Sequence, residues 1–154
     1  MSWSLQIANG DLSLGSSGLN TVTGSDKMVQ DLSCALLEPM GNDPLHPTYG
    51  SLIDGGVDTA GNVNVGMIGQ PNNDQNDTII GAEIQRICRV YQANQIARNN
   101  ADVAVYGKST LTADEALLGV TGLNIQRAED HVLITAVLQT GTGSLPLALP
   151  FSNI

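Results

Sequence analysis

The sequence predicts an α+β fold organised as a single domain over residues 1–154. Apolar residues recur at helical spacing in two stretches, and they alternate with a period of two near both ends of the chain. A chain of 154 residues is also long enough to bury one core of its own. We therefore expect two packed helices against a small antiparallel sheet, with an N-terminal β-meander and C-terminal antiparallel strands.

The first part of the chain reads as short strands. Apolar and polar residues alternate from Trp3 to Ile7, and Asn9-Gly10 is a hairpin signal. The Gly-Ser-Ser-Gly stretch at residues 15–18 allows a second reversal before Leu19 to Val22. These strands should form an antiparallel meander that leads into a helix.

Residues 25–37 predict an amphipathic helix with one buried side. Ser25 or Asp26 can cap its start, because their side-chain oxygens accept hydrogen bonds from unpaired amides. Pro39 ends it, since proline disfavours helical geometry in the preceding residue. The apolar residues that share one face are Met28, Leu32, Ala35 and Leu36.

A proline-marked turn follows this helix. Proline fixes φ and glycine tolerates positive φ, so the turn should hold one shape. The residues that define this structural turn are Pro39, Gly41, Pro44, Pro47, Tyr49 and Gly50.

The same stretch resembles a known protein family. The residues that carry the resemblance are Leu36-Leu37, Pro39, Gly41, Asn42, Pro44, Pro47 and Tyr49-Gly50-Ser51. They resemble the baseplate wedge and sheath-initiator family of contractile phage tails. That family includes the equivalent baseplate component of type VI secretion systems and is often catalogued under a lysozyme-like label. The preceding strands are similar to the family's N-terminal strands, so the resemblance is specific over residues 5–54 and architectural beyond.

The resemblance implies a structural protein of the virion tail baseplate, assembled in the host cytoplasm and placed with sixfold symmetry in the wedges. It implies contacts with other wedge proteins, with tube or hub proteins of the tail and with the tail sheath protein, whose first ring it would template. It transfers no catalytic residue and no cofactor. The Glu-Pro-Arg signature that the family places after the second helix, at a subunit contact, is replaced here by Ala97-Arg98-Asn99-Asn100.

The middle of the chain contains a second helix. Residues 51–56 suggest a short helical turn, and residues 61–69 suggest an irregular strand or an extended loop. The second helix should begin at Thr78 or Ile79 and pack on the first helix. Its apolar stripe is Ile80, Ile84, Ile87, Cys88 and Tyr91.

Shorter elements follow the second helix. Val103 to Tyr106 reads as a short strand. The capping-box match at residues 112–115 predicts a brief helix through Leu118. Strands are then expected at 120–126, 131–140 and 145–151, separated by polar turns.

The last strand is a candidate for contacts between subunits. Pro146 and Pro150 interrupt it, and prolines in a sheet belong on an edge strand. An open edge can accept an extended segment of another chain, while the same prolines can equally protect that edge against aggregation. The candidate partner contacts are Arg86, Arg89, Arg98, Leu145, Leu147, Leu149 and Phe151.

Charge and cysteine content limit the possible partners. Fifteen acidic and six basic residues give a net charge of −9, which would repel nucleic acid and anionic membrane surfaces. The longest nearly apolar run, Val132 to Leu138, is far shorter than the ~20 residues that span a bilayer. Cys34 and Cys88 lie in the predicted helices. We expect buried thiols in a reducing compartment, with a disulfide between the helices as the alternative.

Two other functions remain open. A lysozyme-like enzyme that degrades peptidoglycan would need two carboxyl groups ~5–9.5 Å apart, one with a raised pKa. Candidates are Glu38, Asp43, Asp54 and Glu83, but aromatic residues, which line most sugar clefts, make up 3% of the chain. We predict no catalytic residue.

Metal binding is the third possibility. Asn72, Asp74, Asn76 and Glu83 match positions 1, 3, 5 and 12 of a calcium loop, which would make the protein a calcium-stabilised binding module. Asp77 occupies the place of the required glycine, and a polar loop that caps the helix explains the same residues. The two histidines, His46 and His131, fall short of a zinc ligand set. We predict no metal site and no cofactor.

Overall fold

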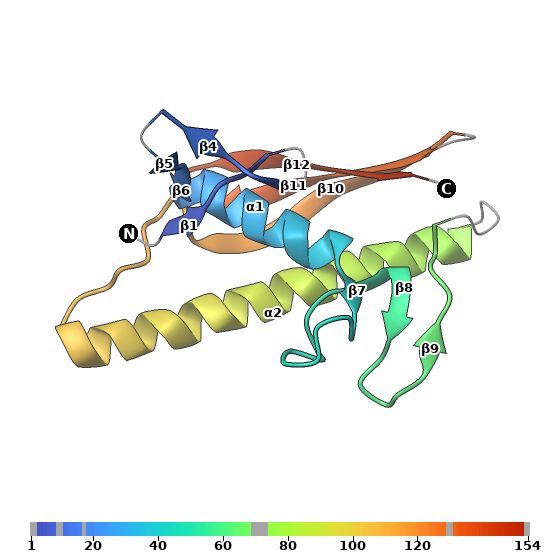
Figure 1. Ribbon diagram of the computed structural model, residues 1–154, viewed down its shortest axis with the longest axis horizontal. Helices are drawn as coiled ribbons and strands as arrows, with labels where there is room; N and C mark the ends of the chain where they lie inside the picture. Colours follow the sequence, from blue (N-terminus) through green and yellow to red (C-terminus); the bar gives the residue numbers. More distant parts are fainter. Residues whose placement is uncertain (1–2, 9–10, 17, 69–73, 129–130, 153–154) are drawn as a thin grey trace.

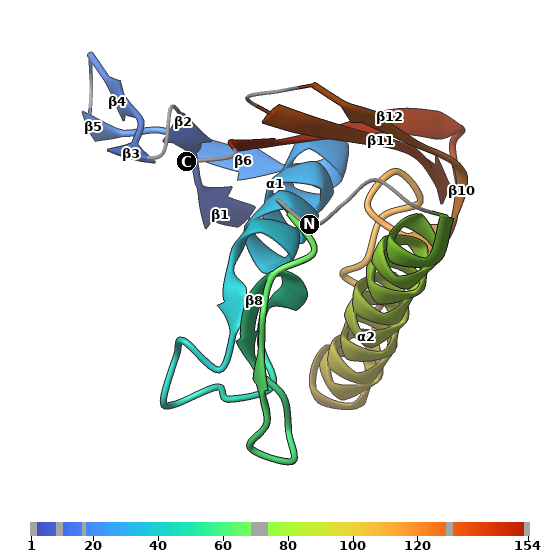
Figure 2. The ribbon, with the colours of Figure 1, turned by 90° about the vertical axis from the view of Figure 1, so that its right-hand side faces the viewer.

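The computed structural model describes residues 3–8, 11–16, 18–68, 74–128 and 131–152. It contains two helices and several small sheets, most of them antiparallel, which confirms the predicted α+β class. The C-terminal sheet forms one layer, and the two helices lie side by side beneath it (Figures 1 and 2). No helix in the described part of the chain combines the length and apolar character needed to cross a membrane.

The N-terminal strands form the predicted antiparallel reversals ahead of the first helix. The strands are β1 (Trp3–Leu5), β2 (Ile7–Ala8), β3 (Asp11–Leu12), β4 (Leu14–Gly15), β5 (Gly18–Leu19) and β6 (Thr21–Thr23). They pair as β1 with β6, β2 with β3 and β4 with β5. The predicted Asn9-Gly10 turn lies outside the described residues.

A ring of backbone hydrogen bonds joins the three N-terminal pairs at their centre. Ser13 donates to Gln6 at 2.8 Å, Gln6 donates to Asn20 at 2.9 Å, and Asn20 donates to Ser13 at 3.0 Å. These three residues are spaced seven positions apart in the sequence, and each forms one corner of the ring. This ring joins the strands of the predicted N-terminal meander into a three-cornered unit.

Helix α1 (Gly24–Leu37) confirms the predicted amphipathic helix, and Met28, Leu32 and Leu36 are fully buried. The prediction that Ser25 or Asp26 caps it is wrong, because both lie inside the helix. Thr23 is at the N-cap position and its side chain makes no capping hydrogen bond. The carboxylate of Asp114 lies close to Gly24 at this end of α1, and the Ser25 backbone contributes to the lowered pKa of Asp114.

The proline-marked turn begins within a small sheet of β7 (Pro39–Met40), β8 (Ser51–Val57) and β9 (Val63–Asn64), and its remaining residues connect β7 to β8. Strand β7 runs parallel to β8, and β9 runs antiparallel to it. The helical turn expected at residues 51–56 is therefore wrong. Ser51 and Ile53 point into the core, and Gly56 has φ +119°, which a strand irregularity tolerates and a helix does not.

Helix α2 (Asp74–Tyr106) is longer than predicted at both ends. No glycine or proline interrupts residues 82–106, so the helix continues through the stretch that reads locally as a strand at 103–106. It stops at Gly107, which has φ +71° and donates its N–H to the carbonyl of Val103 at 2.9 Å.

The capping-box match at residues 112–115 forms a turn instead of a helix. The N–H groups of Glu115 and Ala116 both donate to the Thr112 carbonyl, at 3.2 and 3.0 Å. The chain then enters a strand at Leu117, which pairs with Thr140. Pairing with this distant strand prevents the local helix from continuing.

Three long strands end the chain, as predicted: β10 (Leu117–Arg127), β11 (His131–Thr140) and β12 (Ser144–Ser152). They form an antiparallel sheet in the order β10-β11-β12. The inner face of this sheet packs on both helices to form the core. Its buried residues are Val132, Ile134, Ala136, Leu138, Leu147, Leu149 and Phe151. Cys34, half-buried, and Cys88, buried, carry free thiols, and no disulfide links them.

Candidate interaction surface

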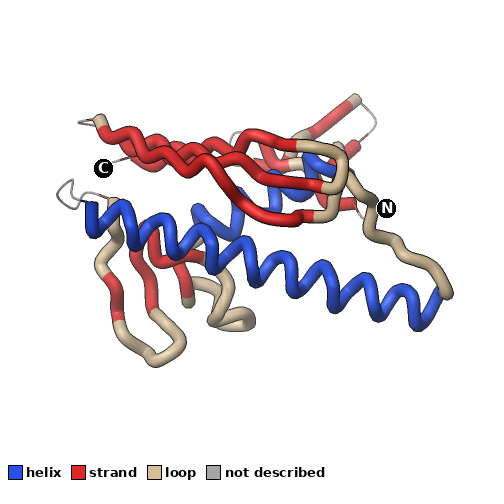
Figure 3. The backbone as a smooth tube through the Cα atoms, turned by 180° about the vertical axis from the view of Figure 1, so that it is seen from behind, coloured by secondary structure: helices blue, strands red, loops and turns tan. Residues whose placement is uncertain are grey.

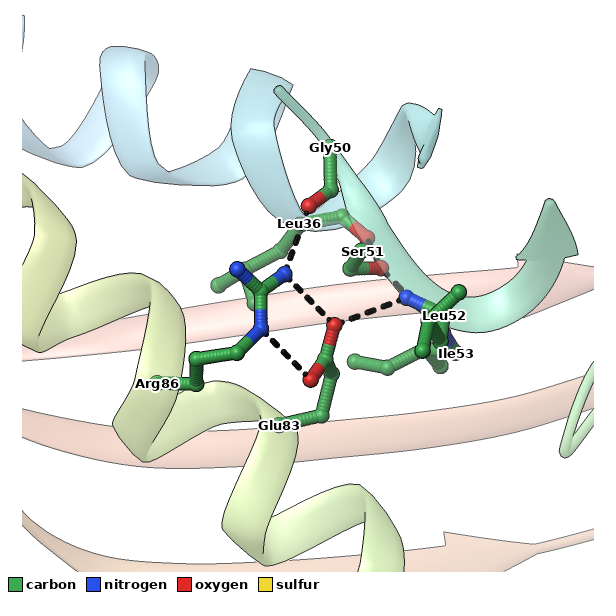
Figure 4. A network of polar contacts seen from close by, with 7 residues as sticks. All are labelled: Leu36, Gly50, Ser51, Leu52, Ile53, Glu83 and Arg86. Carbon is green, nitrogen blue, oxygen red and sulfur yellow. Dashed lines mark hydrogen bonds and ion pairs between the residues drawn. The ribbon is translucent and has the colours of Figure 1, made fainter. Parts of the chain in front are cut away.

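A polar network fixes the base of the turn (Figure 4). The carboxylate of Glu83 on α2 accepts hydrogen bonds from Arg86, at 2.8 Å from Nε and 2.7 Å from Nη2. It also accepts the Leu52 backbone N–H at 2.9 Å. Arg86 Nη2 in turn donates to the Gly50 carbonyl at 2.9 Å. One ion pair on α2 therefore holds the end of the turn and the start of β8.

The hydroxyl of Ser51 adds a second link between the turn and α1. It is fully buried, donates to the Leu36 carbonyl at 2.6 Å and accepts the Ile53 N–H at 3.3 Å. The Leu36 carbonyl lies in the last turn of α1, where helix carbonyls lack intrahelical donors. Ser51 thus satisfies a helix end and positions β8 against it.

The pKa of Glu83 agrees with this structural role. Burial by itself raises the pKa of this carboxyl group, but the hydrogen bonds from Arg86 and Leu52 outweigh burial and leave the pKa below its ordinary value. Glu83 is therefore charged at neutral pH and holds the Arg86 guanidinium. A glycosidase general acid requires the opposite shift, a raised pKa.

The tip of the turn is exposed, although local hydrogen bonds shape it. His46 Nδ1 lies 2.7 Å from the Asp43 carboxylate, and its backbone N–H donates to the Asp43 carbonyl at 3.1 Å. The side-chain hydrogen bond from His46 is the main reason that the pKa of Asp43 is lowered. Leu45 at the tip is 84% exposed. The turn is thus anchored at its base, where Gly50 is buried, and presents its tip to solvent.

The predicted contact residues on α2 have different environments. Arg86 is occupied by Glu83 and Gly50, whereas Arg89 and Arg98 are exposed. Contacts of these arginines with a partner stay a prediction.

The predicted contact residues on β12 mostly face inward. Leu147, Leu149 and Phe151 are at most 5% exposed, and Leu145 is half-buried. Their side chains pack this chain's own core, so a partner would meet the backbone edge of β12 and not these side chains.

The edge of β12 is open. Nine residue pairs join β12 to β11, and no strand pairs with its other side within the described residues. Pro146 and Pro150 lie four residues apart, so their backbone groups point to the same side of the strand. Because proline lacks an N–H and the ladder to β11 is continuous, that side is the open one. Ala148 supplies the one N–H between the two prolines on this edge.

The outer face of the C-terminal sheet is nearly free of charge. Among β10, β11 and β12 the ionisable residues are Arg127 and His131, both at the same end of the sheet. The Arg127 side chain is 11% exposed and pairs with Asp77 at 2.8 Å. The exposed residues on the β12 part of this face are Ser144, Pro146, Ala148 and Pro150. This nearly neutral face contrasts with the net charge of −9 on the whole chain.

The hollows among the described residues include one beside β12 and one between the helices. An open groove of about 800 Å³ separates the N-terminal strands from α1 and the start of β12, and its lining includes Ile7, Val29, Leu37 and Pro146. A smaller polar hollow of about 120 Å³ lies between α1, α2 and residues 110–115. In the smaller one, Lys27 pairs with Asp31, which also accepts the Tyr91 hydroxyl at 3.2 Å. The volume of the smaller hollow is below the ~300 Å³ typical of small-molecule sites.

The calcium alternative does not fit the described residues. Asp74 and Asn76 lie in the first turn of α2, whereas a calcium loop needs them in a non-helical loop; Asn72 lies outside the described residues. Glu83 is held by Arg86. No group of three or more His, Cys, Asp or Glu residues in the described ranges could hold a metal ion.

The sequence does not reveal the structural roles of two residues that connect distant parts of the chain. Glu83 is assigned to a calcium loop, although its spacing of three from Arg86 on a helix is a signal for an ion pair. Asp114 is assigned to a capping box of its own, and nothing local shows that its carboxylate lies at the start of α1. A comparison of the chain with protein-family models, with curated proteins and with solved structures finds no match.

Proposed function

We propose that the protein is a structural wedge component of a contractile-tail baseplate that helps to start sheath assembly. The observation that carries this proposal is the open edge of β12, marked by Pro146 and Pro150, next to a nearly uncharged sheet face. A solvent-exposed strand edge is a template for pairing with another chain, and a neutral face lowers the desolvation cost of contact.

The anchored turn supports a scaffold role. The residues that resemble the sheath-initiator family form one unit of helix, turn and strand, which Glu83 and Arg86 tie to α2. The hydrogen bonds described for this unit join segments of the same chain and fix their relative positions. In this role the unit holds β12 and the two helices in a constant relative position, so that neighbouring subunits meet a preformed surface.

The proposed mechanism is β-augmentation at β12. A partner strand beside β12 finds backbone carbonyl acceptors at the prolines but an N–H donor at Ala148 between them. This uneven pattern of donors and acceptors favours one register over its neighbours, since a shifted strand would leave donors and acceptors unmatched. A sheath subunit would supply the strand, and other wedge proteins and tube or hub proteins would hold the remaining faces at sixfold positions of the virion baseplate.

The substitution Ala148→Pro tests this mechanism. It removes the N–H between the two prolines and places a third proline at a position equivalent to theirs, so we expect the fold to persist. Sheath assembly should fall at least ~10-fold when this variant replaces the wild-type protein, because pairing loses its donor. The measurement is the fraction of tails that carry an extended sheath in electron micrographs.

Ala148→Ser is the matched control, because it keeps the N–H and a small exposed side chain. Sheath assembly should stay at the wild-type level in this variant. A folded Ala148→Pro protein that assembles sheath as well as Ala148→Ser would contradict the proposal.

A further inference from the structure

The groove between the N-terminal strands, α1 and the start of β12 has apolar surface on its floor and on both sides. Its floor is a second face of α1, which carries Val29 and Leu37 and lies opposite the face that packs in the core. Ile7 and Leu145 line its two sides. Ile7 is 44% exposed and Leu37 is 39% exposed, so this chain leaves part of the apolar lining uncovered.

One side chain of α1 fixes the N-terminal wall of the groove. Gln30 donates from Nε2 to the Leu5 carbonyl at 2.8 Å, and its Oε1 accepts the Ile7 N–H at 2.8 Å. These bonds hold the N-terminal strands beside α1, on the side away from α2 (Figures 2 and 3). The groove is therefore preformed, and its volume of about 800 Å³ lies within the ~300–1,000 Å³ typical of ligand sites.

The charge at the groove is acidic. Among the described residues that line it, the charged ones are Asp26, in the first turn of α1, and Glu38, directly after its last residue. The two carboxylates thus mark opposite ends of the groove, and neither belongs to the ion pairs found within the described residues. Glu38 accepts a hydrogen bond from Asn42 at 2.5 Å, and a carboxylate has lone pairs for further donors.

The thiol of Cys34 on the groove floor is affected by the same negative charge. Burial raises the pKa of this thiol, and the charges of Asp31 and Glu38 raise it further. The neighbouring Ser33 hydroxyl is already used, because it donates to the Val29 carbonyl at 2.8 Å. The groove therefore offers a ligand apolar surface between two carboxylates.

The position of the groove favours an extended ligand. Leu145 and Pro146 line the groove and also begin the open edge of β12. An extended segment can place side chains in the groove while its backbone meets this edge, whereas the backbone groups of a helix are already paired. From Asp26 to Glu38 the helix rises about 18 Å, a distance that an extended chain covers in about five or six residues.

A second copy of this chain does not supply such a segment. Four of its six basic residues lie in the two helices, and the other two, Lys108 and Arg127, are far apart in sequence. No extended segment in the described ranges therefore presents two cations at the spacing of the two carboxylates. The ligand has to come from a different protein.

We infer that the groove beside α1 binds an extended segment of a partner protein, in which apolar side chains lie between two basic residues about five or six positions apart. The basic residues pair with Asp26 and Glu38, and the apolar side chains cover Ile7 and Leu37. Charge complementarity at the two ends sets the direction and register of the segment. The inference does not depend on the proposed baseplate role, because binding is measured with the purified chain and a peptide.

The test uses three designed peptides of about nine residues. The first carries two lysines about six positions apart, with alternating valine and threonine between them. The second has glutamate in place of both lysines, and the third has serine in place of the valines. In fluorescence anisotropy the first should bind the full chain at least ~10-fold more tightly than either of the others, and added salt should weaken its binding. No binding of the first peptide, or equal binding of the first and second, would overturn the inference.

Reaction of the cysteines with a maleimide shows where the lysine peptide binds. Cys34 is half-buried in the groove, whereas Cys88 is buried in the core and serves as the internal reference. The lysine peptide should slow the labelling of Cys34 in proportion to the fraction of chain bound, as followed by mass spectrometry. An unchanged labelling rate at saturation would place the peptide elsewhere and overturn the inference.

A pair of charge variants tests the two carboxylates. Asp26→Asn/Glu38→Gln should bind the lysine peptide at least ~10-fold more weakly than wild type. Asp11→Asn/Asp54→Asn is the matched control, because it removes the same charge from exposed positions outside the groove. Equal losses in the two double variants would show that the overall charge of the chain, and not the groove, attracts the peptide.

A pair of leucine variants tests the apolar lining. Leu37→Gln should weaken binding of the lysine peptide at least ~5-fold, whereas Leu45→Gln at the exposed tip of the turn should leave it unchanged. Circular dichroism of each variant checks that the fold persists. A gain of helical signal in the bound peptide would contradict the extended conformation.

Light scattering distinguishes a partner protein from a second copy. The full chain should have the mass of a monomer in solution. A dimer that Leu37→Gln converts to monomer would show that a second copy fills the groove, which would overturn the inference.

Discussion

Glu83 connects three segments that are distant in sequence. Its carboxylate holds Arg86 on the same helix and Leu52 on β8, and Arg86 extends the contact to Gly50 at the end of the turn. Removing this carboxylate charge would leave Arg86 without its counter-ion and the Leu52 N–H with a weaker acceptor. The cost of such a loss exceeds that of an exposed pair, because Glu83 is 9% exposed.

Glu83→Gln should lower the free energy of unfolding by about 2–3 kcal/mol at pH 7, since hydrogen bonds to charged groups are worth more than neutral ones. Urea denaturation followed by circular dichroism measures this change. Asp54→Asn is the control, because Asp54 is an exposed residue of β8, and its unfolding energy should stay within about 0.5 kcal/mol of wild type. Equal effects of the two substitutions would exclude the anchoring role of Glu83.

The pH dependence of stability should report the same carboxylate. The pKa of Glu83 is lowered by folding, so its stabilising contribution is complete above its ordinary value of 4.5. The contribution is lost as pH falls through the lower pKa of the folded state. The difference in unfolding energy between wild type and Glu83→Gln should therefore shrink below that value. A difference that is constant from neutral to strongly acidic pH would argue against this account.

At the scale of elements, α2 consists of two halves with different support. Its first half buries Ile80, Ile84 and Ile87 in the core, whereas its second half rests on polar contacts of Gln95, Asn99 and Asp102. Backbone hydrogen bonds open more easily where few apolar contacts hold them. We therefore expect the second half of this continuous helix to be less stable than the first.

Hydrogen exchange followed by mass spectrometry should separate these halves. Amides of residues 96–106 should exchange at least ~10-fold faster than those of residues 80–90. Peptides from α1, which is buried along one side, serve as the slow reference. Equal protection along the whole of α2 would mean that the second half has support other than the polar contacts described.

Strand β12 also has two sides with separate roles. Its odd-numbered residues, such as Leu147 and Leu149, complete the core, while Pro146, Ala148 and Pro150 face outward. Deleting the whole strand would therefore remove core packing and the edge together. Substitution at Ala148 separates the two roles, because it leaves the buried side unchanged.

At the scale of the whole molecule, one cluster of buried apolar residues in the described chain joins α1, α2, β8 and the C-terminal sheet. Substitution of Leu149 measures how much this cluster contributes to the free energy of unfolding. Leu149→Ala should lower the unfolding energy by about 3 kcal/mol, because it leaves a cavity between the sheet and the helices. Thermal and urea denaturation check the value.

Leu118→Ala is the matched comparison for the core. Leu118 lies in the same sheet but is 63% exposed, so the same chemical change should cost less than about 1 kcal/mol. Similar losses for both leucines would mean that the sheet does not form the core layer described.

Local sequence was sufficient to predict an element where apolar residues recur at a regular spacing along it. The spacing of Met28, Leu32 and Leu36 predicted α1, and alternation predicted β11 and β12, because both patterns report which side of an element meets the core. The turn from Pro39 to Gly50 was also predictable, since proline and glycine restrict the backbone by themselves. The baseplate role rests on a resemblance over these same residues and stays a proposal.

Tertiary structure decided what depends on residues far apart in the chain. Residues 51–57 became a strand because β7 and β9 pair with them, and the capping-box residues gave way to β10 because Leu117 pairs with Thr140. Asp114 reaches α1 and Arg86 reaches Gly50 only after the chain has folded. The anchored turn, the open edge of β12 and the groove beside α1 all follow from which surfaces the remaining elements cover. Local periodicity describes one element at a time and carries no information on such coverage.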